Sequence, residues 1–232
     1  MMNLLAIDTS TESCSAALLC GDRLSERSEL APRRHAELIL PMIDSLLIEA
    51  GLSRRQLDGI AVGRGPGAFT GVRLGISVAQ GLALGLDIPV VPVSSLAALA
   101  YEAPGDADNA ILAVIDARMG EIYAGAFRRG TDGQVTPIMD EMVGRATEFI
   151  FPQSKKWTVV GSGWAAYHDA LAARLPAPPR HADGARYPQA RAIVRLAQPQ
   201  FAAGQGVSPE YALPVYLRDK VALTLEEQRA AR

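Results

Sequence analysis

The chain has 232 residues, of which 49% are hydrophobic and 21% charged, and its formal net charge is −2 at pH 7. These values are typical of a globular protein of one large or two small domains, and they exclude a disordered chain and a polycation that coats nucleic acid. Cys14 and Cys20 would lie about 20 Å apart on one strand, beyond disulfide reach. No uncharged apolar run approaches about 18 residues, and the N-terminus lacks the pattern of a secretion signal. We therefore expect a cytoplasmic protein that does not cross a membrane.

The first half of the chain alternates strand and helix patterns. The periodicity predicts strands over residues 4–8, 13–20, 24–30, 59–62 and 88–93, and helices over residues 35–50, 70–86 and 94–101. Gly21-Asp22 is a two-residue hairpin signal between the second and third strands. Gly51 is a natural residue to end the first helix, and Ser53–Gln56 has a capping-box pattern. Thr70 and Ser94 are expected to cap the two later helices.

The element order begins again after a linker at residues 103–108. Strands are predicted over residues 111–116, 121–128, 134–139 and 157–160, with helices near Ala146, over residues 164–174 and over residues 189–196, and a tail over residues 211–222. Both halves follow the order strand-strand-strand-helix-strand-helix. We therefore predict an α/β fold of two lobes, residues 1–104 and 105–232, with the tail packing back on the first lobe.

The two long helices of the first half carry more apolar surface than one sheet can cover. Apolar residues span about 200° of the first helix, whereas a helix packed on one sheet needs a stripe only a little wider than about 100°. In the second helix, Gly71, Gly75 and Ala79 recur every four residues and would form a groove that another backbone can approach. The helices are either buried between their own sheet and its neighbour, or they also form a face for a partner chain. We favour the partner face, because two such helices exceed the core of so small a chain.

Little catalytic machinery is visible in the sequence. Asp8-Thr9-Ser10-Thr11 follows the first strand, where actin-like ATPases place a phosphate-binding turn, but Ser10 stands where such turns usually carry glycine. We interpret Asp8, Thr9, Ser10 and Thr11 as a degenerate nucleotide-binding turn. No histidines have metal-ligand spacing, neither cysteine lies in a reactive motif, and the glycine-rich run at residues 65–75 lacks the Lys-Ser/Thr of a Walker loop. No catalytic residue, metal ligand or tightly bound cofactor is predicted.

Several motifs along the chain resemble one protein family. Residues 4–10, 34–37 and 61–73 resemble the TsaB (YeaZ) family, the dimerization subunits of the bacterial tRNA threonylcarbamoyladenosine machinery. The resemblance continues at residues 116–123 and 214–218, so it covers nearly the whole chain. The run Gly-Pro-Gly-x-Phe-Thr-Gly-x-Arg is specific to this family and its paralogue TsaD, and here Ala68 replaces the serine that is usual in it.

This resemblance implies the actin/hexokinase/Hsp70-like (ASKHA) fold and the role of a non-catalytic scaffold. TsaD, the catalytic subunit, carries a His-x-x-x-His metal motif, whereas His35 is followed by Ile39 in this chain. The implied role is to bind and support TsaD as it transfers a threonylcarbamoyl group to the adenosine beside the anticodon of tRNAs that read codons beginning with A. The ATPase TsaE joins the complex, ATP and metal belong to the partner subunits, and the chain meets tRNA only through the complex.

The resemblance also implies that TsaD binds the first-lobe helices and that the isolated chain forms a homodimer through the same face. The expected partner-binding residues are Leu38, Ile39, Met42, Ile43, Leu46, Gly71, Val72, Gly75, Val78, Ala79 and Leu82. The alternative is an enzyme acting alone, either an actin-fold phosphotransferase or an M22-type, glycoprotease-like peptidase. Ser10 in place of glycine and the missing histidine pair favour the subunit over the enzyme.

Overall fold

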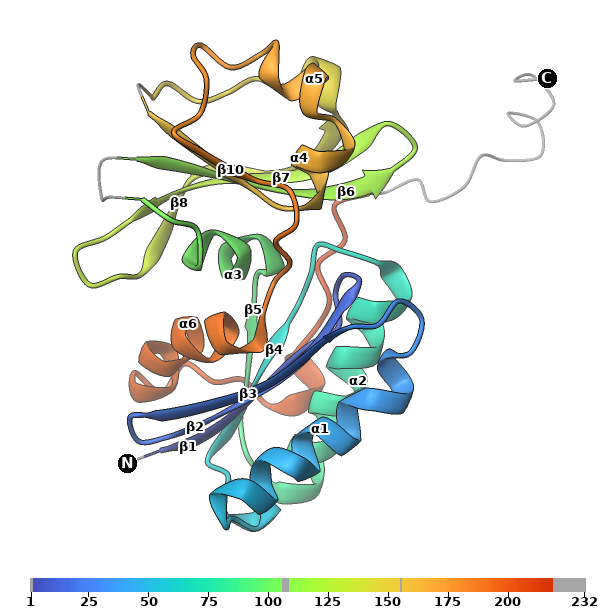
Figure 1. Ribbon diagram of the computed structural model, residues 1–232. Coiled ribbons are helices and arrows are strands. Elements are labelled where there is room, and N and C mark those ends of the chain that lie inside the picture. The colour runs from blue at the N-terminus through green and yellow to red at the C-terminus, as the bar shows by residue number, and fades with distance from the viewer. Residues whose placement is uncertain (1, 106–108, 155, 219–232) are drawn as a thin grey trace, which may run out of the picture.

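The protein consists of two lobes, each built around a five-stranded mixed sheet (Figure 1). The computed structural model describes residues 2–105, 109–154 and 156–218. The first sheet has the order β3-β2-β1-β4-β5 and contains β1 (Asn3–Asp8), β2 (Ser13–Cys20), β3 (Arg23–Leu30), β4 (Gly59–Gly63) and β5 (Val90–Val93). The second has the order β10-β9-β6-β7-β8 and contains β6 (Ala110–Arg118), β7 (Glu121–Arg129), β8 (Val135–Arg145), β9 (Trp157–Val160) and β10 (His181–Asp183).

The two sheets repeat one strand arrangement. In the first lobe, β1, β2 and β3 pair antiparallel, while β4 and β5 run parallel to β1. In the second lobe, β6, β7 and β8 pair antiparallel, while β9 and β10 run parallel to β6. Two mixed sheets of the same order, each covered by helices, fit an actin-like fold.

Helices lie outside and between the two sheets. They are α1 (His35–Ala50), α2 (Phe69–Leu86), α3 (Ser95–Tyr101), α4 (Ser162–Ala166), α5 (His168–Ala172) and α6 (Ala190–Ala202), with 3-10 turns at η1 (Arg54–Gln56), η2 (Ala146–Glu148) and η3 (Pro209–Tyr211). Figure 1 shows α1 and α2 on the outer face of the first sheet, α4 and α5 on the outer face of the second, and α3 and α6 between the sheets.

The two halves of the chain exchange their inner helices. α6, which is late in the sequence, packs Ile193 against the first sheet in one core cluster with Leu4. α3 precedes the linker, yet it packs Leu96 against the second sheet in a cluster with Phe127. The predicted boundary between residues 104 and 105 divides the sequence into two halves. Each lobe nevertheless includes one inner helix from the other half, α6 in the first lobe and α3 in the second.

Several short-range predictions are confirmed. Cys20 pairs with Arg23 across the Gly21-Asp22 hairpin, and Gly51 ends α1 with a φ of 66°. The capping box of Ser53 and Gln56 is present, and the Ser94 hydroxyl accepts a hydrogen bond of 3.0 Å from the amide of Ala97. Each of these features depends on residues only a few positions apart, so the local sequence is enough to predict it.

Other predictions were wrong in detail. α2 begins at Phe69, because the Ala68 carbonyl accepts the first helical bond from Val72, so Thr70 lies within the first turn and is not the cap. The helix near Ala146 is a single 3-10 turn. It ends at Phe149, which has an extended backbone and is buried in the core. The helix over residues 164–174 is two short helices that meet at Tyr167. The predicted linker and tail extend into residues 106–108 and 219–222, outside the described residues.

Two kinds of glycine occur in α2. A Cβ at Gly71 would overlap the carbonyl oxygen of Thr9, and one at Gly75 would lie 2.7 Å from the Thr9 hydroxyl. A Cβ at Gly81 or Gly85 would meet no atom within 4 Å. The atoms that approach Gly71 and Gly75 therefore belong to Thr9 in the chain's own turn after β1, not to a partner backbone, which corrects the predicted groove.

Replacing Gly71 by alanine should destabilise the protein, whereas replacing Gly81 should not. Overpacking against a backbone carbonyl typically costs about 1–3 kcal/mol. Alanine at the open Gly81 position should instead raise the free energy of unfolding by up to about 1 kcal/mol, because alanine is the better helix former. Urea denaturation of the two variants measures both effects, and equal changes for Gly71→Ala and Gly81→Ala would contradict this packing.

Candidate functional site

The predicted nucleotide-binding turn follows β1 and is buried. Asp8, Thr9, Ser10 and Thr11 are each at most 5% exposed. The Asp8 carboxylate accepts hydrogen bonds from the Ser10 amide at 3.0 Å and the Ser10 hydroxyl at 2.9 Å. Burial raises the pKa of Asp8 to about 7, and the hydrogen bonds from Ser10 only partly oppose this.

The chain itself uses most polar groups of this turn. The Thr9 hydroxyl donates to the carbonyl of Gly71 at 2.7 Å, and the Ser10 carbonyl accepts from the amide of Ala68 at 2.7 Å. The imidazole Nε2 of His35 lies 2.8 Å from the Thr11 carbonyl. The Ser10 amide, which could bind a phosphate, already donates to Asp8, so the turn does not present it to a ligand.

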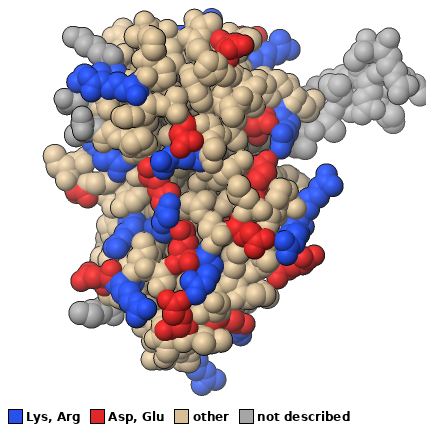
Figure 2. Space-filling view, viewed as in Figure 1, with Lys and Arg blue, Asp and Glu red and all other residues tan. Residues whose placement is uncertain are grey.

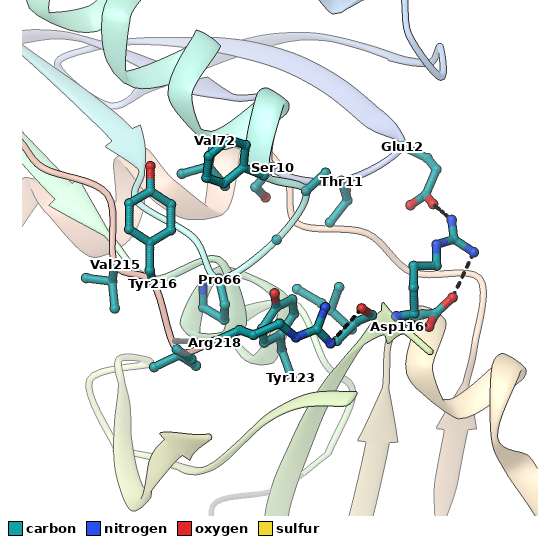
Figure 3. Close-up of a pocket in the computed structure, with 17 residues that line it drawn as sticks. Ser10, Thr11, Glu12, Pro66, Val72, Asp116, Tyr123, Val215, Tyr216 and Arg218 are labelled. Atoms are coloured by element: carbon teal, nitrogen blue, oxygen red, sulfur yellow. Dashed lines mark hydrogen bonds and ion pairs between the residues drawn. The ribbon is translucent and has the colours of Figure 1, made fainter. Parts of the chain in front are cut away.

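A cavity of about 250 Å³ lies next to this turn, between the two lobes (Figure 3). The turn after β1, the start of α2, the β6–β7 turn and the C-terminal segment form its walls. The Arg118 guanidinium lies 2.8 Å from Glu12 and 2.8 Å from Asp116, and Arg218 forms an ion pair with Glu121. An anionic ligand would therefore have to compete with carboxylates for both arginines.

Asp8 is the last residue of β1 and Asp116 lies close to the end of β6 (Ala110–Arg118), so the two residues occupy similar places in the repeated sheets. The Asp116 carboxylate accepts from the Arg118 amide at 2.8 Å and from the Tyr167 hydroxyl at 3.0 Å. Its side chain is 12% exposed and paired with an arginine, whereas Asp8 is fully buried and bonded to a serine. The two strand ends thus offer different chemistry at similar positions.

The described residues do not assemble the parts of a hydrolytic or metal site. His35 lies at the start of α1 and contacts a backbone carbonyl, and Ile39, one turn later, is buried in the core. Across residues 2–105, 109–154 and 156–218, no three His, Cys, Asp or Glu side chains come together as potential metal ligands. The Ser10 hydroxyl donates to the Asp8 carboxylate, and the His35 ring contacts the Thr11 carbonyl rather than this hydroxyl.

The structure divides the eleven predicted partner-binding residues into two groups. Seven of them are buried in the chain's own interior, namely Ile39, Ile43, Leu46, Gly71, Val72, Gly75 and Ala79. The other four, Leu38, Met42, Val78 and Leu82, are half-buried and border that core. A residue inside the core cannot contact a second chain directly, so only the half-buried group faces outward.

The outward surface of α2 also contains residues that the sequence prediction missed. Leu74 is half-buried, Gly81 and Gly85 are exposed, and Leu84 is 73% exposed. We call Leu38, Met42, Leu74, Val78 and Leu82, with the exposed Gly81, the outer helix face. The sequence contains a pattern that could have identified these residues. A helix that connects two parallel strands packs one side against its sheet, and the small residues Gly71, Gly75 and Ala79 mark the side suited to close packing. The residues on the other side of α2 therefore face outward.

α2 is also apolar enough, by length and composition alone, to span a membrane, although only 28% of it is buried inside the chain. Its two ends connect to β4 and β5, which are paired neighbours in one sheet, and Ile76 and Ala83 lie in the core of the first lobe. These connections hold α2 flat against the sheet. Its apolar outer side therefore lies at the surface of the first lobe.

Comparison with known proteins agrees with this arrangement. Residues 27–224 match the family model described as "TsaD: tRNA N6-adenosine threonylcarbamoyltransferase". The chain is 40% identical to the tRNA threonylcarbamoyladenosine biosynthesis protein TsaB of Escherichia coli (strain K12), covering 95% of this chain and 96% of that protein. It is also 40% identical to TsaB of Haemophilus influenzae, covering 95% of each.

Solved structures extend the similarity to the fold. YeaZ from Pseudomonas aeruginosa superposes with a TM-score of 0.86 and 44% identity, covering 94% of this chain and 100% of that chain. A second structure from the same organism, described as similar to the peptidase YeaZ, has the same TM-score of 0.86 and 43% identity over the same shares of both chains. Both similarities include both lobes.

Burial of Asp8 should make the stability depend on pH. Because the pKa is about 7 in the folded protein and about 3.9 in an unfolded chain, the folded state binds more protons between these values. The stability should therefore fall as the pH rises, by up to about 1.4 kcal/mol per pH unit. Asp8→Asn should remove this component. Urea denaturation from about pH 4 to pH 7 measures it, and identical pH slopes for wild type and variant would contradict the assignment.

Proposed function

The chain belongs to the TsaB family of tRNA threonylcarbamoyladenosine biosynthesis proteins, and on this premise we propose that it is a non-catalytic scaffold subunit that binds and supports TsaD. The observation that carries the proposal is the outer helix face, an apolar surface that the chain's own core covers only in part. Apolar surface of this kind on a soluble protein marks a site of protein association.

The interlobe cavity supports the non-catalytic part of the proposal. Catalysis of group transfer needs polar groups that are free to stabilise charge on the reacting atoms. In this chain the Ser10 amide donates to Asp8, and Arg118 and Arg218 are paired with carboxylates. We infer that ATP and metal are bound by the partner subunits rather than by this chain.

The outer helix face suits a partner that presents helices of its own. Gly81 has open space where a side chain would be, so a second helix can approach α2 closely. A stable interface buries roughly 800 Å² per partner, and two adjacent helices of 16 and 18 residues offer a surface of that order. We propose that TsaD binds there, and that a second copy of the chain occupies the same face when TsaD is absent.

The remaining parts of the proposed assembly follow from the family. We propose that the ATPase TsaE joins the pair and that tRNA is met through the complex, in the cytoplasm. On the face drawn in Figure 2, basic and acidic side chains are interspersed. Binding of tRNA to one protein surface calls for a basic patch or stripe, and this face does not present one.

An enzyme acting alone is not favoured. A structural relative was described as similar to a peptidase, but here His35 contacts a carbonyl and the Ser10 hydroxyl donates to a buried carboxyl group. A phosphotransferase would need backbone amides that face the phosphates. The turn after β1 does not offer its Ser10 amide in this way.

Gly81→Arg should weaken binding to TsaD and dissociate the homodimer without unfolding the protein. The position is exposed and open, so arginine fits the monomer but holds a partner helix away from α2. We expect a loss of affinity of about tenfold or more, equivalent to at least about 1.4 kcal/mol. Co-purification and titration with TsaD measure the first effect, and light scattering measures the second.

The matched control is Ala202→Arg, at an exposed position on α6, which packs on the opposite face of the first sheet. It should bind TsaD and self-associate like the wild type. In reconstituted tRNA modification, Gly81→Arg should lose activity that returns when TsaD is supplied in large excess. If a folded Gly81→Arg protein bound TsaD normally while modification was lost, the scaffold proposal would be wrong.

The isolated chain should neither bind ATP tightly nor hydrolyse it. The reason is that the Ser10 amide and the cavity arginines already have partners within the chain. Isothermal titration calorimetry should give no micromolar binding, and a phosphate-release assay should give no turnover, with TsaE as the positive control. Micromolar ATP binding by this chain alone would overturn the assignment of ATP to the partners.

A further inference from the structure

The segment from Ala212 to Arg218 passes from the first lobe to the second. It begins beside α2, where the side chain of Gln80 donates to the Ala212 carbonyl at 3.2 Å. It then runs along the loop after β4, where the Val215 amide donates to the Arg64 carbonyl at 2.9 Å. Both contacts attach the segment to the first lobe.

The middle of the segment is held by an aromatic cluster at the start of α2. The Tyr216 ring lies 5.6 Å from that of Phe69, centroid to centroid. The Arg73 Nε donates to the Tyr216 hydroxyl at 2.6 Å, and its guanidinium lies 3.6 Å from the Phe69 ring centre. The same guanidinium lies 5.4 Å from the Tyr216 ring centre, so a tilted ring contact, a hydrogen bond and a cation–π contact all act on this tyrosine.

The end of the segment reaches the second lobe. The Arg218 guanidinium donates to the Ala117 carbonyl on β6 at 3.0 Å and forms an ion pair with Glu121 on β7. The Arg218 side chain is 19% exposed, whereas that of Arg118, which also bridges the lobes, is 71% exposed. Because exposed ion pairs contribute little, Arg218 forms the stronger of these two links.

We propose that Ala212–Arg218 is an interlobe brace that fixes the angle between the two lobes. Besides the brace, the contacts between α3 and α6 and the ion pairs Arg64–Glu141 and Arg118–Glu12 connect the lobes. The brace adds a connection at the cavity, and Figure 3 shows the Arg218 side chain beside Tyr123 with the Tyr216 ring pointing away from it. Two lobes can rotate about the contacts that join them, and each further connection restricts that rotation.

This inference goes beyond the scaffold role, because it assigns a mechanical task to a segment outside the outer helix face. In many two-lobed proteins a bound ligand draws the lobes together. Here the chain supplies the bridging groups itself, and they line the cavity that a ligand would enter. The angle between the lobes is then set by the chain itself and does not depend on a bound ligand.

The test measures the distance between the lobes in the isolated full chain. Spin labels are attached at Glu37→Cys on α1 and Asp169→Cys on α5, both exposed, after Cys14 and Cys20 are changed to alanine. Labelled protein is diluted with unlabelled protein so that double electron–electron resonance reports distances within one molecule.

The variants that test the brace are Arg218→Gln and Tyr216→Ala. Their matched controls are Arg128→Gln, on the exposed part of β7, and Tyr211→Ala, which is 68% exposed on η3.

The brace predicts one narrow distance distribution for the wild type and for both controls. Arg218→Gln and Tyr216→Ala should broaden this distribution and shift its mean to longer distances, while circular dichroism remains that of the folded protein. Narrow, unshifted distributions in both folded variants would overturn the proposal. This result would leave the scaffold role standing, since the role is tested separately through Gly81 and TsaD.

Discussion

Close packing of α2 on the turn after β1 is the contact on which the rest of the structure depends. Gly71 and Gly75 allow the helix to touch Thr9, and the Thr9 hydroxyl is bonded to the Gly71 carbonyl. The same turn accepts the Ala68 amide. This contact sets how α2 is rotated about its axis, so it decides which apolar residues enter the core, which remain outside, and where Phe69 and Arg73 stand to hold the C-terminal segment.

Burial on the opposite face of the first sheet accounts for the chemistry of the same turn. A Cβ at Gly63 of β4 would overlap the Asp8 carboxylate and lie 3.3 Å from Ile193 of α6, so Asp8 is buried between β4 and α6. A buried carboxylate is costly unless it is paired with a charge or neutralised. Asp8 meets a serine rather than a cation, so its pKa rises to about 7. Asp116, close to the end of β6, is instead paired with Arg118. The two carboxylates are therefore stabilised in different ways: burial raises the pKa of Asp8, whereas Asp116 is paired with an arginine.

The sequence predicts the parts of this fold better than their arrangement. The hairpin at Gly21-Asp22 and the caps at Gly51 and Ser94 depend on neighbouring residues, and the strands of the first lobe have strong apolar periodicity. The exchange of α3 and α6 depends on tertiary packing that no local pattern encodes. Apolar periodicity also could not separate the buried Ile39 from the half-buried Leu38, because both belong to the wide apolar arc of α1.

The glycine spacing of α2 also explains why a helix of this lobe has an apolar outer side. A helix between two parallel strands packs one stripe against its sheet, and Thr9 leaves no room for a side chain at Gly71 or Gly75 of that stripe. With Gly71, Gly75 and Ala79 facing inward, Val78 and Leu82 fall at the edge of the buried stripe and Leu74 and Gly81 lie further outward. Leucine and valine at these positions are already partly covered by the lobe, and a second chain that covers the remaining surface adds further burial energy. The residues that fit the helix to its own turn thus determine the surface that remains for a partner.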